Sequence, residues 1–139
     1  MRSDDETKVQ DIMTKNPHTL EADNVLDLAD DLMTMARVRH IPILERGTLV
    51  GIVSQRDLFF SALDKLLGIR QKEQKDLMKT IRAREVMSHP VITISAGASV
   101  KEAARLMGEN RIGCLPVVKD KKFVGLVTET DILRYVAAR

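Results

Sequence analysis

The sequence predicts an α/β fold built from two copies of one small unit, each a short mixed sheet with helices packed on it. Three observations lead to this prediction. Residues 125–131 (Gly-Leu-Val-Thr-Glu-Thr-Asp) are echoed by residues 51–57 (Gly-Ile-Val-Ser-Gln-Arg-Asp). Each of these stretches follows, at the same distance, a strand-like run that contains a proline, Pro42 or Pro116. Apolar residues in two further segments recur with the period of an amphipathic helix.

The two halves of the chain align without a gap from Ala29 onward, so they form an internal repeat. Met33 corresponds to Met107 and Asp57 to Asp131, and each pair is 74 positions apart (33 to 107, 57 to 131). A helix–strand–strand–helix unit of this size cannot bury the face of its own sheet. We therefore expect two units stacked face to face about a pseudo-twofold axis, with two equivalent crevices.

The first half carries the signals of short strands between helices. Its expected elements are a helical turn at 9–13, a strand at 18–20, a helix at 25–35, strands at 41–44 and 49–53 joined by a turn at 45–48, and a helix at 56–67. Asp23 or Asn24 is the expected cap of the helix at 25–35. Pro42 predicts that its strand lies at a sheet edge or begins there. The core-facing stripe of the helix at 25–35 is Val25, Leu28, Ala29, Leu32 and Met33.

The second half repeats these signals. Its expected elements are a strand at 92–94, a helix at 100–110, strands at 115–118 and 123–127 joined by a turn at 120–121, and a helix at 130–136. Ser99 and Glu102 form a predicted capping box for the first of these helices. The connector at 69–82 has an excess of basic residues interspersed with acids, which favours a solvated helical linker over a nucleic-acid footprint.

Composition excludes several classes of protein. The net charge of +2 is too small to imply a polyanionic partner, and aromatic residues at 3% offer few platforms for stacking bases. Cys114 is the one cysteine, so no intrachain disulfide can form and a reducing compartment is expected. No apolar run is long enough to span a membrane, and the polar, acidic start of the chain does not fit a signal peptide. We expect a cytoplasmic protein.

Catalytic motifs are missing from the sequence. His18, His40 and His89 are not at metal-ligand spacings. Cys114 has no evident base beside it, so a structural thiol is expected. No glycine-rich phosphate loop or nucleophile elbow is present, and we expect that the protein is not an enzyme.

The repeated Ser/Thr-x-x-Asp stretch has two interpretations. Thr128 and Asp131 stand where the N-cap and third residue of a helix would stand, as do Ser54 and Asp57, so each pair can cap a helix. Capping explains the hydroxyl. It explains less well why both copies carry Asp, since Glu or Gln serves equally in a cap, and a binding role for the carboxylates stays open.

Taken in order, the motifs resemble those of the CBS (cystathionine β-synthase) domain. They are Ala-x-x-x-Met in a helix (29–33 and 103–107), a hydrophobic-Pro-hydrophobic strand, and Gly-hydrophobic-Val-Ser/Thr-x-x-Asp. Two such domains in tandem resemble a Bateman module. The resemblance covers about residues 9–136 and predicts a free-standing pair, with repeat 1 at 8–68, a helical linker at 69–82 and repeat 2 at 83–139.

The resemblance implies a regulatory or sensor module. CBS pairs bind adenosine-containing ligands, such as AMP, ADP, ATP or S-adenosylmethionine, in clefts between the repeats, and some bind other nucleotides. No cofactor would be required; the adenine nucleotide is a ligand that Mg²⁺ could accompany. The module would act in trans on an unidentified effector protein.

One expected cleft is centred on Asp131. By the resemblance, Asp131 accepts hydrogen bonds from the ribose hydroxyls, which suits a carboxylate facing a vicinal diol. Thr128 and Thr130 would lie near the ribose and the phosphate. The residues expected near the adenine are Ile92, Thr93 and Leu126.

The other expected cleft is centred on Asp57. Asp57 would bind the ribose there, with Ser54 and Arg56 near the ribose and phosphate. The residues expected near the adenine are Thr19 and Ile52.

Phosphate contacts in such pairs often come from the partner repeat, from basic residues just before the hydrophobic-Pro pair. In the first repeat these are Arg39 and His40, which would face the Asp131 cleft. In the second repeat the same places hold Gly113 and Cys114, so phosphate binding at the other cleft is in doubt. Without the resemblance, Arg39 reads as an exposed basic side chain and His40 as a satisfied histidine at a strand start.

Two other functions compete with ligand sensing. The first is a structural dimerisation module with empty clefts, and the second is nucleic-acid binding through the connector. A surplus of apolar residues on the helices that follow Asp57 and Asp131 predicts a homodimer joined through those helices. The residues that carry this prediction are Phe59, Phe60, Leu63 and Tyr135.

Overall fold

The computed structural model describes residues 7–58, 76 and 78–139, and the chain divides into two compact units. One consists of Met1–Pro17 together with Ile92–Arg139, and we call it the Asp131 unit. The other is His18–Val91, which we call the Asp57 unit. The predicted helix at 56–67 is described only at its start, where residues 55–58 are helical, and most of the connector lies outside the described residues.

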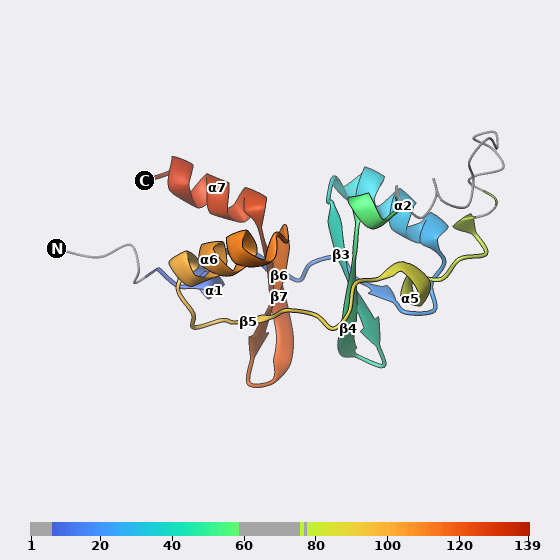
Figure 1. Ribbon diagram of the computed structural model, residues 1–139, viewed down its shortest axis with the longest axis horizontal. Coiled ribbons are helices and arrows are strands. Elements are labelled where there is room, and N and C mark those ends of the chain that lie inside the picture. Colours follow the sequence, from blue (N-terminus) through green and yellow to red (C-terminus); the bar gives the residue numbers. More distant parts are fainter. Residues whose placement is uncertain (1–6, 59–75, 77) are drawn as a thin grey trace. The chain divides into compact units, whose positions relative to one another are not determined.

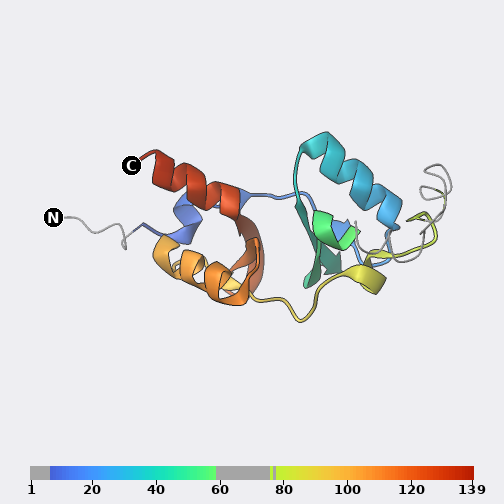
Figure 2. The ribbon, with the colours of Figure 1, turned by 45° about the horizontal axis from the view of Figure 1, so that its top comes forward.

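In its described residues, the Asp131 unit has a four-stranded sheet in the order β1-β7-β6-β5 and three helices (Figure 1). Its strands are β1 (Thr14–Lys15), β5 (Ile94–Ser95), β6 (Cys114–Lys119) and β7 (Lys122–Thr128). Its helices are α1 (Val9–Ile12), α6 (Val100–Asn110) and α7 (Glu129–Ala137). Figure 2 shows α1, from the beginning of the chain, beside α6 and α7 from its end.

The Asp57 unit has a three-stranded sheet in the order β2-β3-β4 (Figure 1). Its strands are β2 (Leu20–Glu21), β3 (His40–Glu45) and β4 (Thr48–Ser54), and its helices include α2 (Leu26–Ala36) and α5 (Ala83–Val86). The α/β fold predicted from the sequence, with a small mixed sheet and helices in each unit, is confirmed.

Both long hairpins turn through residues with positive φ. Arg46 and Gly47 have φ of 52° and 80°, and Asp120 and Lys121 have φ of 53° and 66°. Two successive positive φ values are typical of a type I′ turn, whose twist matches that of the flanking strands. The turns predicted at 45–48 and 120–121 are therefore confirmed.

The prediction that Pro42 marks a sheet edge or a strand start is wrong. Pro42 is the third residue of β3, the middle strand of its sheet. It lies opposite Ile52, whose backbone N–H and C=O bond to Ser88 on the other side of β4. Pro42 therefore directs its nitrogen away from β4, toward β2, which begins to pair with β3 one residue later, at Ile43. A central strand tolerates the missing N–H at this position because no ladder bond is lost.

The short strands are displaced from their predicted positions. β2 and β5 begin at Leu20 and Ile94, the last residues of the predicted strands at 18–20 and 92–94. Each pairs in parallel with the hairpin of its unit, as Leu20 does with Ile43 and Ile94 with Val117. Pairing with the hairpin therefore determines where each short strand begins, and this position cannot be predicted from the local apolar pattern.

Helix α2 is shifted by one residue from its prediction. Its N-cap is Val25, with no side-chain cap, and Asn24 instead accepts a hydrogen bond from the Glu21 N–H (2.8 Å). The buried residues of α2 are Leu26, Ala29 and Met33, whereas Leu28, predicted to face the core, is 46% exposed. In α6, Ser99 accepts from the Glu102 N–H (3.0 Å), which confirms the hydroxyl half of the predicted capping box. The Glu102 carboxylate pairs with Arg105 instead.

Each unit combines most of one sequence repeat with the opening segment of the other. Val9 donates to the Ala98 carbonyl (2.8 Å) and Val100 to the Thr7 carbonyl (3.0 Å), which joins α1 to the start of α6. The Asp57 unit shows the same arrangement, since Leu26 donates to the Ile81 carbonyl (2.8 Å). Residues 8–17, which open the first sequence repeat, thus pack in the unit that contains most of the second repeat. Residues 83–91, which open the second repeat, pack in the unit that contains most of the first.

Gly125 and Gly51 make room for these two opening segments, which contain Met13 and Met87. A Cβ on Gly125 would lie 2.6 Å from the Met13 sulfur and 2.9 Å from the Thr14 carbonyl oxygen. A Cβ on Gly51 would overlap the Met87 sulfur. Real Cβ atoms do not approach other atoms this closely, so a side chain at Gly51 would displace Met87, and one at Gly125 would also strike backbone. Gly125 therefore permits the close approach of the Thr14 backbone to β7.

Candidate functional site

Thr128 and Asp131 join the end of β7 to the start of α7. The Thr128 N–H donates to Oδ2 of Asp131 (3.0 Å), and the Asp131 N–H donates to Oγ1 of Thr128 (3.2 Å). This reciprocal pair is a capping box, in which two backbone donors at the helix start find side-chain acceptors. The capping interpretation of the sequence motif is therefore confirmed for this copy.

Ser54 and Asp57 repeat the arrangement in the other unit. The Ser54 N–H donates to Oδ2 of Asp57 (2.8 Å), and the Asp57 N–H donates to Oγ of Ser54 (3.0 Å). Both carboxylates thus use Oδ2 for the cap, and the cap makes no use of Oδ1. Both aspartates are half-buried at the end of a strand, so the cap still leaves acceptor capacity on a partly accessible carboxylate.

Thr14 is a further residue at the Asp131 carboxylate, and the sequence reasoning missed it. Its hydroxyl donates to Asp131 and lies 3.3 Å from both Oδ1 and Oδ2. Thr14 reaches this place because β1 pairs with β7, with Thr14 opposite Leu126. The available signal was the repeat itself, since Ser88 occupies the equivalent place in the second copy. The repeat alone did not indicate a site at Thr14, because the sequence does not show that the opening segment of the first repeat packs in the unit that contains Asp131.

The Asp57 carboxylate lacks the equivalent contact. Ser88 pairs through its backbone with Ile52, and among the described residues no hydrogen bond joins the Ser88 hydroxyl to Asp57. The two aspartates therefore share a cap and differ in their outer hydrogen-bond partners.

Four other residues predicted for the Asp131 cleft lie in the same unit at different depths, whereas Arg39 and His40 belong to the Asp57 unit. Leu126 is buried in β7, next to the capping box, and points to the opposite face of the sheet from Val127. Thr130 is exposed on the first turn of α7. Ile92 and Thr93 are exposed just before β5, which β6 separates from β7 in the sheet. The described contacts bring Thr128, Asp131 and Leu126 together with Thr14, and they do not join Ile92 or Thr93 to that group.

The residues predicted for the Asp57 cleft also lie within one unit. Ile52 is half-buried in β4, Arg56 is exposed in the helical turn at 55–58, and Thr19 precedes β2. His40, the first residue of β3, lies opposite Ser54 in the strand register. The Arg39 carbonyl accepts from the Gln55 N–H (2.8 Å), and the Arg39 side chain is exposed. Arg39 and His40 are thus neighbours of the Ser54 cap, and their predicted role toward Asp131 stays a prediction.

Cys114 is buried at the start of β6, opposite Thr128. Burial, and secondarily the charge of Glu129, raise the pKa of this thiol to about 12. A thiol with such a pKa remains protonated and is a poor nucleophile near neutral pH. This agrees with the structural role expected from the sequence.

No metal site or membrane helix is found in the described part of the chain. Its His, Cys, Asp and Glu residues form no group of three that could hold a metal ion. None of its helices has the length and apolar character needed to cross a bilayer.

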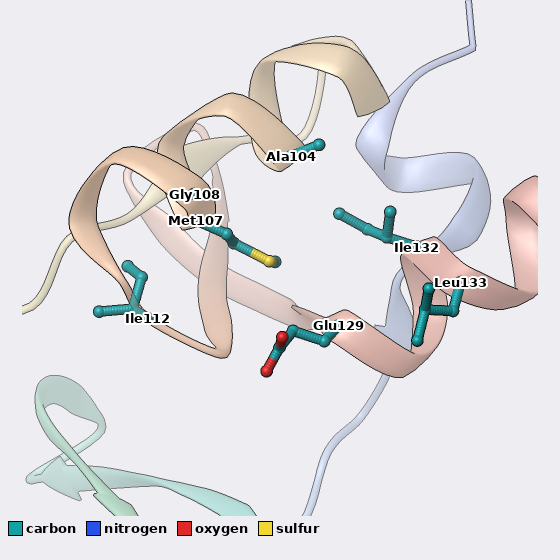
Figure 3. A pocket seen from close by; sticks show the side chains of 7 residues that line it. All are labelled: Ala104, Met107, Gly108, Ile112, Glu129, Ile132 and Leu133. Atoms are coloured by element: carbon teal, nitrogen blue, oxygen red, sulfur yellow. The ribbon is translucent and has the colours of Figure 1, made fainter.

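An apolar pocket of about 260 Å³ opens between α6 and α7 (Figure 3). Glu129 stands at its edge, and the other side chains are aliphatic or methionine. The lining residues are Ala104, Met107, Gly108, Ile112, Glu129, Ile132 and Leu133. Near it, Leu133 and Val136 of α7 are 67% and 54% exposed. By contrast, Tyr135, expected at a dimer surface, is half-buried and its hydroxyl lies 3.1 Å from Oγ1 of Thr7. Phe59, Phe60 and Leu63 lie outside the described residues.

Comparison with known proteins agrees with the repeat. The family model of the CBS domain matches residues 9–64 and 83–138. A CBS domain-containing protein of Dictyostelium discoideum is 28% identical over 127 residues, which cover 90% of this chain and 88% of that protein. An uncharacterised protein of Methanocaldococcus jannaschii is 33% identical over 136 residues; the match covers 95% of this chain and 32% of that longer protein.

Two similar structures contain adenosine derivatives. The CBS domain pair of protein MJ0100, solved in complex with 5′-methylthioadenosine and S-adenosyl-L-methionine, has a TM-score of 0.78 and 30% identity. CBSX2, solved in complex with AMP, has a TM-score of 0.76 and 29% identity. Each match covers 95% of this chain and 97% of the other.

Proposed function

Because the chain belongs to the CBS domain family, we propose that it is a regulatory module that binds an adenosine-containing ligand through Asp131 and Asp57. The observation that carries this proposal is the pair of capped carboxylates. In each, the cap uses Oδ2 and makes no use of Oδ1, and acceptor positions remain on the carboxylate even with the Thr14 hydroxyl at Asp131. An ionised carboxylate in this position can accept hydrogen bonds from the two hydroxyls of a ribose.

The start of α7 offers a phosphorylated ligand both favourable and unfavourable electrostatics. The first turn of α7 directs backbone N–H groups outward, and the positive end of the helix dipole favours an anion near Thr128 and Thr130. Asp131 and Glu129 on the same turn oppose that field, so phosphate binding needs additional cations. Arg39 and His40 are the basic residues we propose for that role.

The complexes of similar proteins support the choice of ligand class. The structures of MJ0100 and CBSX2 contain 5′-methylthioadenosine, S-adenosyl-L-methionine and AMP, which share the adenosine group. We propose that adenosine is the common recognition element for this chain as well. Which of AMP, ADP, ATP or S-adenosylmethionine is the physiological ligand depends on the phosphate or sulfonium contacts. A magnesium ion would accompany only the ligands with several phosphates.

Phosphate contacts should distinguish the two aspartates. Arg39 and His40 have Gly113 and Cys114 as their counterparts, and the buried, protonated thiol of Cys114 supplies no positive charge. A charge-assisted hydrogen bond to phosphate contributes about 1.5–3 kcal/mol. AMP should therefore bind at Asp131 about ten- to a hundredfold more tightly than at Asp57. Adenosine, which lacks the phosphate, should show a much smaller preference.

The module would act on an effector protein in trans and assemble as a homodimer in the cytoplasm. The apolar pocket between α6 and α7, together with the exposed Leu133 and Val136, offers a surface for a second copy. Sedimentation should show a dimer at tens of micromolar, and a monomer under these conditions would contradict this part of the proposal.

The apolar pocket also supports a second candidate function, a structural dimerisation module that binds no ligand. The same surface would then be the whole function, and the aspartates would serve only as helix caps. Ligand binding distinguishes the two candidates. Nucleic-acid binding stays a third and weaker candidate, which a salt-dependent mobility-shift assay would detect.

A thermal-shift screen tests the main proposal. The ligands are AMP, ADP, ATP, S-adenosylmethionine, 5′-methylthioadenosine and NAD(H). A ligand at about 100 times its dissociation constant should stabilise the fold by roughly 2.7 kcal/mol, which raises the melting temperature by several degrees. If none of these ligands raises the melting temperature at millimolar concentration, the dimerisation module is the better account.

A further inference from the structure

We propose that Thr14 is a positioning residue for the Asp131 carboxylate and makes the Asp131 site more selective for an intact ribose diol than the Asp57 site. This inference rests on the proposed function and deepens it. Its basis is the contact between the Thr14 hydroxyl and both carboxylate oxygens at 3.3 Å. Thr14 does not belong to the Ser/Thr-x-x-Asp motif and lies 117 residues from Asp131 in the sequence.

The number of acceptor positions on the carboxylate explains how Thr14 could act. A carboxylate offers about four lone-pair directions. At Asp131, the Thr128 N–H takes one of them on Oδ2, and the single proton of the Thr14 hydroxyl takes another. About two directions remain, which is the number that the two hydroxyls of a vicinal diol require.

Thr14 also limits rotation of the carboxylate. The capping box alone holds one oxygen, so Oδ1 can swing about the bond to Oδ2. A second donor located equally far from both oxygens restricts that motion. The remaining acceptor directions are then aligned before the ligand arrives, and the cost of ordering them on binding is lower.

The strand pairing keeps Thr14 in place. β1 is held on β7 by the pairs Thr14 with Leu126 and Lys15 with Gly125. Gly125 permits this approach, because any side chain there would strike the Thr14 carbonyl. The hydroxyl is therefore carried by a backbone that is itself part of the sheet.

The Asp57 site provides the internal comparison. It has the same cap, yet the Ser88 hydroxyl makes no hydrogen bond to Asp57 among the described residues. Since Thr14 and Ser88 both carry a hydroxyl, the difference lies in side-chain placement and not in residue chemistry. Removing the Thr14 hydroxyl should weaken ligand binding at Asp131, whereas removing the Ser88 hydroxyl should not change ligand binding at Asp57.

The test is titration calorimetry with two ligands, adenosine and 2′,3′-dideoxyadenosine, which differ in the diol alone. The variant Thr14→Val removes the hydroxyl, keeps the β-branched shape and preserves the backbone pairing. It is compared with Thr14→Ser, which retains the hydroxyl, and with the matched variant Ser88→Val. All variants are measured in an Asp57→Asn background, so that only binding at Asp131 is observed. Ser88→Val is measured again in an Asp131→Asn background, so that only binding at Asp57 is observed. Melting temperatures confirm that each variant folds, and Thr14→Ala serves if the valine variant does not.

We expect Thr14→Val to weaken adenosine about fivefold, which corresponds to about 1 kcal/mol. Its affinity for dideoxyadenosine should not change, and Thr14→Ser and Ser88→Val should stay within about twofold of their parents. Equal loss for both ligands would assign Thr14 a general structural role, and unchanged or tighter adenosine binding would show that it does not position the carboxylate. Either result overturns the inference alone. If the unmodified chain binds neither AMP nor adenosine, the proposed function is wrong and this inference falls with it.

Discussion

Replacing Gly125 by alanine should weaken the packing of residues 7–17, which contain α1 and β1, in the Asp131 unit. The new methyl group would lie 2.6 Å from the Met13 sulfur, 3.2 Å from its methyl carbon and 2.9 Å from the Thr14 carbonyl oxygen. The methionine side chain can rotate away, but the carbonyl belongs to β1, which is paired with β7. The substitution therefore forces either a backbone shift or a partial loss of the segment.

The expected cost follows from what that segment buries. Over-packing of this kind costs about 1–3 kcal/mol. If the segment detached instead, exposure of Val9, which is fully buried, would cost about 1.5–3 kcal/mol and exposure of Met13 a part of that. We expect Gly125→Ala to lower the free energy of unfolding by about 1–3 kcal/mol, because over-packing is the smaller of the two costs.

Urea denaturation followed by circular dichroism measures this change. Gly108→Ala is the matched control: Gly108 lies within α6, and a Cβ there would meet no atom within 4 Å. Alanine favours the helix at that position, so the control should gain about 0.5–1 kcal/mol. The variant Gly125→Ala with Met13→Ala should recover little stability, because the contact with the Thr14 carbonyl remains. Equal stability of Gly125→Ala and the parent chain would refute the account of the close approach.

Three further predictions concern other parts of the chain. Cys114 should not react with a thiol reagent at pH 8 in the folded protein and should react in denaturant. Because burial raises the pKa of Cys114 from 9 to about 12, the folded state retains the proton that the unfolded state loses, and stability should fall as the pH rises from 9 toward 12. Thr128→Ala should cost about 1 kcal/mol through loss of the helix cap, and Thr128→Ser should restore it. Arg84→Met should reduce the melting temperature slightly at low salt, because Arg84 pairs with Asp23 and Glu45, and high salt should abolish the difference.

Much of the fold could be predicted because its signals are local. Both long hairpins follow from apolar runs around turn residues, and α6 follows from its period and from the cap at Ser99. The Thr128–Asp131 and Ser54–Asp57 pairs could be located from the repeat, and their capping geometry from residue chemistry alone.

The parts that could not be predicted depend on contacts between distant segments. Nothing near residue 9 shows that α1 will pack beside α6 and α7, because that arrangement is decided by Gly125 and the backbone around Ala98. The hydrogen bond from Thr14 to Asp131 is a consequence of the same arrangement. The short strands β2 and β5 differ from their predicted positions for a similar reason, because the neighbouring hairpin determines where a two-residue strand can pair.

The most direct test of the proposed function is titration calorimetry of AMP with the variant Asp131→Asn. Asparagine can still accept from the Thr128 N–H, so the helix cap is preserved, while the charge and one acceptor for the ribose are lost. Asp120→Asn, in the exposed hairpin turn of the same unit, removes an equal charge and serves as the control. We expect Asp131→Asn to eliminate the tighter AMP binding event and Asp120→Asn to leave it unchanged. Full AMP affinity in Asp131→Asn would contradict the assignment of this carboxylate to the ligand.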